Sequence, residues 1–231
     1  MLFLEDHIAW QAPAGRRLDE FARRLPARPR LEIIVFGSAP LQLLVDSQFL
    51  SADIDICSDE PTYQVLLDFV AAQGWSQEKS GEFYVQVCDP LAFKSTSNWS
   101  GRAIRVERHG HLFIFVHPWD VLVSKLQRLE EKDLNAFRLV IGKTGHPTEE
   151  EFARHLQLAV DLYRPKFDEE SARGDMLMNT RLLWQTLWAK DIDVRARIIR
   201  PALERVEREY RETDPNLKTR LANLRLPDDV K

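Results

Sequence analysis

One segment, residues 31–57, constrains the fold more than any other part of the chain. It opens with LEIIVF at residues 31–36, an almost continuous apolar run that is rich in β-branched side chains. Such a run predicts a strand that is covered on both faces of a sheet. Gly37 and Ser38 end this strand, and DIDIC at residues 53–57 predicts a second one. The chain is therefore expected to build a sheet with helices packed against it.

The hydrophobic pattern changes where Gly142, Gly145 and Pro147 interrupt the chain. Before this point short apolar runs alternate with helical periodicities, and after it almost every segment is typical of helix. The expected strands are 31–36, 53–57, 82–88, 103–107 and 112–116, and the expected helices are 14–25, 41–49, 61–73, 118–140, 148–163, 175–190 and 193–212. We predict an α/β (α+β) domain with a mixed sheet and helices over residues 1–145, followed by an all-helical domain over residues 146–231.

Composition excludes several classes of protein. The chain has 231 residues, of which 44% are hydrophobic and 29% are charged, as in an ordinary soluble domain. No stretch approaches 18 consecutive apolar residues, so we expect no membrane span. Cys57 and Cys88 are too few for a disulfide framework or a zinc site, and acidic residues stand where a signal peptide carries basic ones. We therefore expect a cytoplasmic protein, and its net charge of −4 disfavours binding to nucleic acid through bulk charge.

Two carboxylates in the second predicted strand form the first candidate site. Alternate residues of a strand point to the same face, so Asp53 and Asp55 should lie side by side while Ile54 and Ile56 enter the core. Adjacent carboxylates repel each other, and a bound cation would offset that cost. Mg²⁺ (or Mn²⁺) is the natural candidate, because it takes oxygen ligands and shares them with substrate phosphates. Such ions can activate an attacking oxygen and stabilise a leaving pyrophosphate.

Gly37 and Ser38 form the second candidate site. A glycine after a buried strand lets backbone amides approach a ligand closely, and the Ser38 hydroxyl can donate a further hydrogen bond. The N-terminus of the following helix would add unpaired N–H groups and a positive dipole. Together these groups suit a triphosphate, and the predicted topology would bring them close to the two carboxylates.

Gly37-Ser38 followed by Asp53-x-Asp55 resembles the signature of the nucleotidyltransferase superfamily, which has a DNA polymerase β-like fold. The resemblance implies that the Gly-Ser loop binds the phosphates of a nucleoside triphosphate and that the Asp pair binds a divalent metal. It also implies the reaction, which transfers a nucleoside monophosphate to an acceptor hydroxyl and releases pyrophosphate.

A second stretch, HPWDVLVSKLQRLEEKDL at residues 117–134, is similar to a segment of the AbiEii-type abortive-infection toxin nucleotidyltransferases and related bacterial proteins. The positions that match are Asp120, Lys125, Lys132 and Asp133. The resemblance implies that Lys125 binds the nucleotide, and Arg102 joins it because relatives often have Trp-x-x-Arg where this chain has Trp99 and Arg102. It further implies a toxin-like enzyme with a tRNA or protein acceptor and an antitoxin partner. A small molecule such as an aminoglycoside is the alternative acceptor.

The chain departs from this family pattern at two positions. Many relatives have a third carboxylate on the next core strand, where this chain has Gln86, so we assign the third catalytic acid to Asp89. Many also have an arginine shortly before the Asp pair, where this chain has Phe49. These departures support an alternative, a catalytically silent nucleotidyltransferase fold that acts as a binding or interaction module.

Ordinary structural roles are also open for several of these residues. Lys125, Arg128 and Lys132 share one face of the predicted helix and could be solvated partners of neighbouring glutamates, and Asp133 could pair with a nearby cation. Asp120 could favour the start of its helix through the helix dipole, and Arg102 could be a surface arginine. A further interpretation is RNA binding through the C-terminal arginines Arg195, Arg197 and Arg200.

Overall fold

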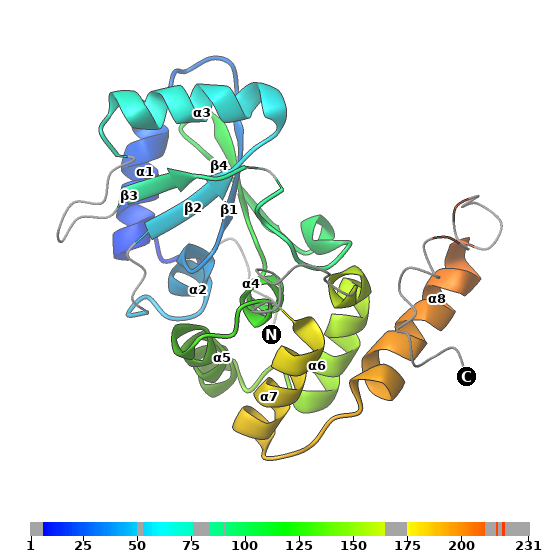
Figure 1. Cartoon of the computed structure of the whole chain (residues 1–231). Coiled ribbons are helices and arrows are strands. Elements are labelled where there is room, and N and C mark those ends of the chain that lie inside the picture. The colour runs from blue at the N-terminus through cyan, green and yellow to red at the C-terminus, as the bar shows by residue number, and fades with distance from the viewer. Residues whose placement is uncertain are drawn as a thin grey trace.

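Figure 1 shows a sheet in the upper part of the molecule, with helices α1 and α3 beside it and helices α4 to α8 below and to the right. This computed structural model describes residues 7–49, 53–75, 84–89, 91–164 and 175–210, together with residues 216 and 219. Within these ranges no helix is both long enough and apolar enough to cross a membrane.

The sheet is mixed, as the sequence predicts. Its strands are β1 (Glu32–Phe36), β2 (Asp53–Cys57), β3 (Tyr84–Val87), β4 (Ile104–Arg108) and β5 (His111–Phe115), and their order across the sheet is β3-β2-β1-β5-β4. β1 runs parallel to β5 and antiparallel to β2, while β3 runs parallel to β2 and β4 antiparallel to β5. The predicted strands at 31–36, 53–57, 103–107 and 112–116 are thus confirmed within one residue, and the described part of 82–88 contains β3.

β1 is covered on both faces, which explains its continuous apolar sequence. Ile33 and Val35 belong to a core that packs against α1 (Pro13–Arg24) and α3 (Glu60–Ala72). Ile34 and Phe36 point to the opposite face, where they contact a second core built on α4 (Pro118–Leu126). The alternation of side chains along β1 therefore connects both layers of the molecule.

The predicted helix at 118–140 is wrong as a single element, because the chain breaks it into α4 and α5 (Glu131–Thr144). Leu129 between them has a φ of 49°, a left-handed conformation that ends α4. α5 then starts from a capping box in which the Asp133 side chain accepts a hydrogen bond from the Glu130 N–H at 3.1 Å. Side-chain hydrogen bonds stabilise this break, while the apolar periodicity continues across it. The hydrophobic pattern therefore did not reveal the break.

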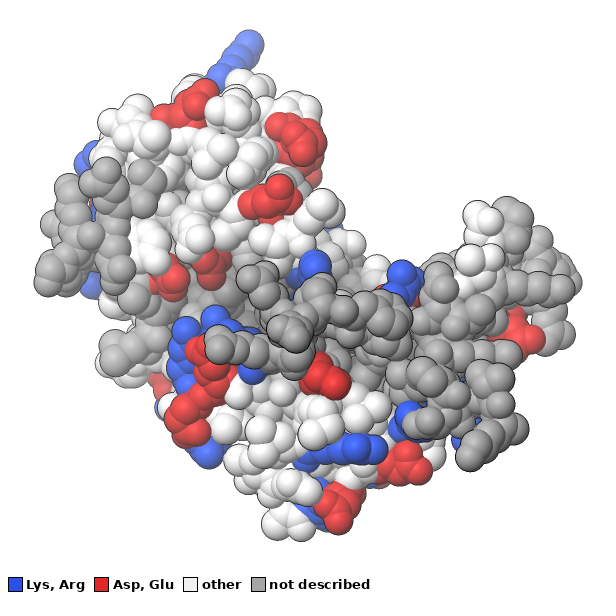
Figure 2. Space-filling view, in the orientation of Figure 1, with Lys and Arg blue, Asp and Glu red and all other residues white. Residues whose placement is uncertain are grey.

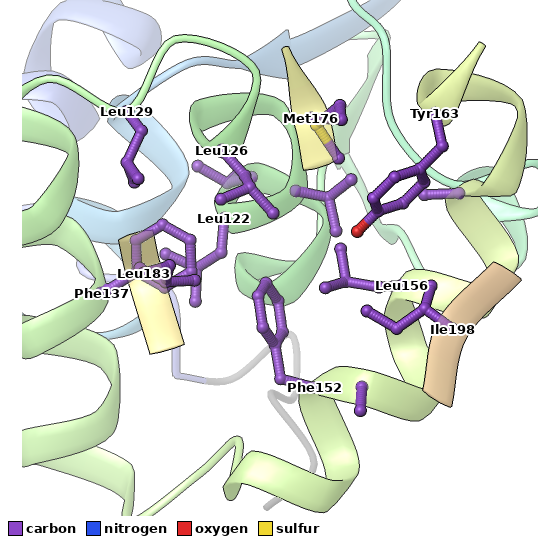
Figure 3. Packing of buried hydrophobic residues seen from close by; sticks show 14 of the residues in the cluster. Leu122, Leu126, Leu129, Phe137, Phe152, Leu156, Tyr163, Met176, Leu183 and Ile198 are labelled. Carbon is purple, nitrogen blue, oxygen red and sulfur yellow. The ribbon is translucent and has the colours of Figure 1, made fainter. Parts of the chain in front are cut away.

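The later helices pack into the same core as α4 and α5. They are α6 (Glu149–Leu156), the 3₁₀ segment η3 (Gln157–Tyr163), α7 (Met176–Trp188), the π-helical segment η5 (Arg195–Ile199) and α8 (Arg200–Tyr210). Figure 3 shows Phe152, Leu156 and Leu183 of this region gathered with Leu122 and Phe137. This hydrophobic core therefore spans the predicted division at residue 145, and the assignment of 146–231 as a separate domain stays a prediction.

Candidate active site

An open cleft of about 740 Å³ lies where the sheet meets α4 and α5. This volume is in the range of small-molecule sites. The cleft lining includes Gly37, Ser38, Asp53, Asp55 and Lys125, so the structure brings together five of the seven residues to which the sequence analysis assigns a catalytic, metal-binding or nucleotide-binding role. In the orientation of Figure 2, acidic side chains lie above a group of Lys and Arg side chains on the left side of the molecule.

The Asp pair projects from β2 into this cleft because the strand alternates. Ile54 and Ile56 are fully buried, so Asp53 and Asp55 point to the opposite face, as predicted. The Tyr84 hydroxyl lies 3.4 Å from Oδ2 of Asp53, to which it can donate only a weak hydrogen bond.

Gly37 leaves the space that Asp55 occupies. Asp55 pairs in register with Phe36, the residue before this glycine. A Cβ atom added to Gly37 would lie 1.9 Å from Oδ2 of Asp55 and 2.9 Å from its Cγ. Gly37 also has a φ of 65°, a left-handed backbone conformation that residues with a side chain rarely adopt. A residue with a side chain at this position would collide with the carboxylate, so this Gly-Asp contact fixes the Gly-Ser turn against β2.

Nearby positive charge offsets only part of the cost of ionising the Asp55 carboxylate. Burial and the neighbouring charge of Asp53 raise the pKa of Asp55 to about 6, although Lys125 and Arg128 act in the opposite direction. A carboxylate pair in this state suits a divalent cation. Among the described residues no three His, Cys, Asp or Glu side chains form a metal-binding group. Two carboxylates that share an ion with substrate phosphates match how Mg²⁺ is ordinarily held, so the donor set fits Mg²⁺.

Lys125 supplies positive charge on the opposite side of the cleft. Its Nζ donates a hydrogen bond to Oγ of Ser38 at 2.9 Å and lies 3.4 Å from Oδ1 of Asp133. The side chain is 10% exposed, and burial lowers its pKa although Asp133 opposes that shift. The helix after Ser38, α2 (Ala39–Leu44), has only six residues instead of the nine expected. Lys125 therefore adds side-chain positive charge to the partial charge at the N-terminus of this short helix.

Asp133 is the residue whose importance the sequence left open. It is fully buried and accepts hydrogen bonds from Nε and Nη2 of Arg128, each at 2.9 Å. Burial would raise the pKa of Asp133, but the Arg128 hydrogen bonds and the Lys125 charge outweigh it and lower that pKa. The single carboxylate of Asp133 therefore orients two cations that line the cleft, Lys125 and Arg128. The helical spacing alone placed both cations on one face but did not indicate this common anchor.

Two of the predicted site residues lie elsewhere. Asp89 is exposed and accepts a hydrogen bond from the Leu91 N–H at 2.7 Å, and it is absent from the described cleft lining. Gln86 instead stands in register beside Asp55 and lines the cleft. Arg102 is also absent from that lining, because its Nε and Nη2 donate to the carboxylate of Asp120 at 3.0 and 2.9 Å. The assignments of Asp89 as third acid and Arg102 as nucleotide ligand therefore find no support in the geometry.

Asp120 has a structural role outside the cleft. It is fully buried, and Oδ1 accepts a hydrogen bond from Thr96 at 2.6 Å and lies 3.2 Å from Nε2 of His155. Burial would raise the pKa of Asp120, but interactions with His155 and Arg102 outweigh it and hold that pKa well below its ordinary range. This cluster joins the start of α4 to residues 95–102 and to α6.

The C-terminal arginines are partly used within the fold. Arg197 donates to Glu149 at 2.6 Å and also pairs with Glu150. Glu149 in addition accepts hydrogen bonds from Trp184 at 3.1 Å and from Lys190 at 2.5 Å. These contacts attach η5 and α7 to α6, so Arg197 is not freely available to bind RNA phosphates.

The mixed sheet, the Gly-Ser turn and the facing Asp pair define a nucleotidyltransferase-like protein. A family model described as a nucleotidyltransferase of unknown function (DUF6036) matches residues 16–139, which is more than half of the chain, and the protein belongs to this family. No curated protein and no solved structure matches the chain. The family match covers the whole cleft lining, and it does not extend to a resemblance specific to abortive-infection toxins.

Replacing Gly37 with alanine tests the Gly-Asp contact. Gly37→Ala should reduce the free energy of unfolding by more than Gly110→Ala, measured by urea denaturation. Gly110 also has a positive φ, 85°, but nothing lies within 4 Å of a Cβ added there. Gly110→Ala should therefore lower the free energy of unfolding by only about 1–2 kcal/mol. The double variant Gly37→Ala/Asp55→Ala should regain part of the free energy of unfolding that Gly37→Ala loses. Equal losses in the two glycine variants would contradict the collision.

The raised pKa of Asp55 predicts a stability that depends on pH. Between the ordinary value of 3.8 and about 6, the native state retains a proton that the unfolded chain releases, so this contribution to stability is lost as pH rises. Asp55→Asn should therefore stabilise the metal-free protein more at pH 8 than at pH 5, by about 1–3 kcal/mol. Urea unfolding in a chelator at both pH values measures this difference. An equal effect at both pH values would refute the shift.

Proposed function

We propose that this protein is a metal-dependent nucleotidyltransferase that moves a nucleoside monophosphate from a nucleoside triphosphate to an acceptor hydroxyl. The observation that carries the proposal is the Asp55 carboxylate packed against Gly37. It faces a cleft in which Lys125 donates a hydrogen bond to Ser38. One side of the cleft therefore has two neighbouring carboxylates, while the other has positive charge and a hydroxyl group.

Asp53 and Asp55 would hold Mg²⁺ or Mn²⁺, since their carboxylates share one face of β2. The ion would polarise the phosphates and stabilise the charge that develops during transfer. Ser38 and Lys125 would bind the outer phosphates, and Arg128 adds a second cation to the same wall. These side chains would hold the triphosphate for attack by the incoming hydroxyl, and such positioning accounts for most catalysis of phosphoryl transfer. The hydroxyl oxygen would bond to the α-phosphorus and lose its proton to solvent, while the bond from the α-phosphorus to the bridging oxygen of the β-phosphate would break and pyrophosphate would leave.

A hydroxyl of tRNA or of a protein is the acceptor that we propose, with a toxin-like role and an antitoxin partner. The support is the similarity of residues 117–134 to abortive-infection nucleotidyltransferases, in which Lys125 and Asp133 occupy matching positions. Lys125 lines the cleft, and Asp133 contacts Lys125 and orients it. An aminoglycoside-like acceptor is the alternative within the same reaction class.

Gln86 favours a second candidate, a silent binding module. It lies in register with Asp55, and an amide neither ionises nor accepts a proton at neutral pH. If an acid at this place is essential, the cleft would bind a nucleotide without transferring it.

Transfer of label from α-labelled nucleoside triphosphates tests the two candidates. Each nucleotide is supplied with Mg²⁺ or Mn²⁺, and total tRNA and the protein itself serve as acceptors. We expect label in one acceptor, with a loss of more than about 100-fold in Asp53→Asn and in Asp55→Asn. Asp68→Asn, at an exposed position on α3, makes the same chemical change outside the cleft and should retain activity. Nucleotide binding without transfer to tRNA, to the protein or to an added aminoglycoside would favour the silent module.

Asp133→Asn tests how the cationic wall is positioned. The amide retains the size of the carboxylate but loses the charge that holds Lys125 and Arg128, so KM for the nucleotide should rise about 10- to 100-fold while kcat changes less. Glu131→Gln is the matched control, because Glu131 is 71% exposed on the same helix and pairs with Arg138. A lower melting temperature with an unchanged KM would assign Asp133 a purely structural role.

A further inference from the structure

Four aromatic residues of the described chain line the cleft, namely Phe36, Phe49, Tyr84 and Phe93, and neither the charge pattern nor the sequence motifs account for Phe93. Phe93 lines the cleft and is only partly buried. Its ring centroid lies 5.1 Å from that of Phe36 and 5.2 Å from that of Trp99, the latter in an edge-to-face arrangement. Phe36 directly precedes Gly37, so the Phe93 ring stands beside the turn that carries Ser38.

The chain around Phe93 is anchored to α4, the helix that carries Lys125. Gln127 donates a hydrogen bond to the backbone carbonyl of Lys94 at 2.8 Å. Ser95 donates to the backbone carbonyl of Asp120 at 2.8 Å, and the Asp120 carboxylate binds Thr96 and Arg102. These contacts fix the wall in place before any ligand arrives. They also assign a use to Asp120 and Arg102, which support the wall from outside the cleft.

An aromatic ring beside phosphate-binding side chains suits a ligand with a flat ring and a charged tail. Lys125 and Ser38 recognise only the charged part, and a phosphate chain alone gains nothing from an aromatic wall. A nucleobase stacks on such a ring through its π-face, which every base has. Because Phe36 and Trp99 already hold the ring, stacking would cost little side-chain entropy.

We propose that Phe93 is the stacking surface for the base of the nucleotide, so that the cleft binds a nucleoside triphosphate by its base as well as by its phosphates. This inference rests on the proposed function, which places the phosphates at Ser38 and Lys125. Stacking contributes affinity for all four bases and leaves selection among them to other groups.

Calorimetric titration of the full chain, with Mg²⁺ present, separates the base from the phosphates. ATP and inorganic tripolyphosphate are the two probes. Phe93→Leu retains apolar bulk against Phe36 and Trp99 but removes the aromatic face, so ATP should bind about tenfold more weakly while tripolyphosphate binding is unchanged. Phe93→Trp should keep the affinity for ATP. Leu91→Ala, at a residue 80% exposed on the same segment, is the matched control and should change neither probe.

The outcomes distinguish this inference from the proposed function. Equal weakening of both probes in Phe93→Leu, or no weakening of ATP, would overturn the stacking role while the phosphate site stands. Wild-type protein that binds neither probe would overturn the proposed function and the stacking role with it. We expect Phe93→Leu to weaken the binding of ATP alone and Phe93→Trp to retain the wild-type affinity for ATP.

Discussion

The contact between the Gly37 backbone and the Asp55 carboxylate is the constraint on which the rest of the site depends. It brings the turn after the central strand against the strand that carries both acids, and no side chain fits between them. The carboxylate is left partly buried beside Asp53, which raises its pKa and makes the pair ready for a cation. The negative side of the cleft is thus built into the sheet itself.

Two buried carboxylates organise the opposite side. Asp133 orients Lys125 and Arg128 toward the cleft, while Asp120 ties the segment that bears Phe93 to the start of α4. Each carboxylate is fully buried, and each has hydrogen bonds to a partly exposed arginine that offset the cost of burying its charge. α4 and the start of α5 therefore hold both the cationic wall and the aromatic wall beside the sheet.

Much of this arrangement follows from the sequence because it is local. The period of two along β2 places Asp53 and Asp55 on one face, and the apolar run of β1 requires layers on both of its sides. The break between α4 and α5 did not follow, because it depends on side-chain contacts of Asp133 that apolar periodicity does not reveal. The position of Asp89 outside the described cleft lining and the contacts of Phe93 required strand register and tertiary contacts, which one sequence does not specify.

The most direct test of the account is a crystal structure of the protein with Mg²⁺ and a nonhydrolysable nucleoside triphosphate. The account predicts the metal between Asp53, Asp55 and the phosphates, with the outer phosphates within hydrogen-bond distance of Ser38 and Lys125. A nucleotide bound outside this cleft, or a metal held without either aspartate, would contradict it.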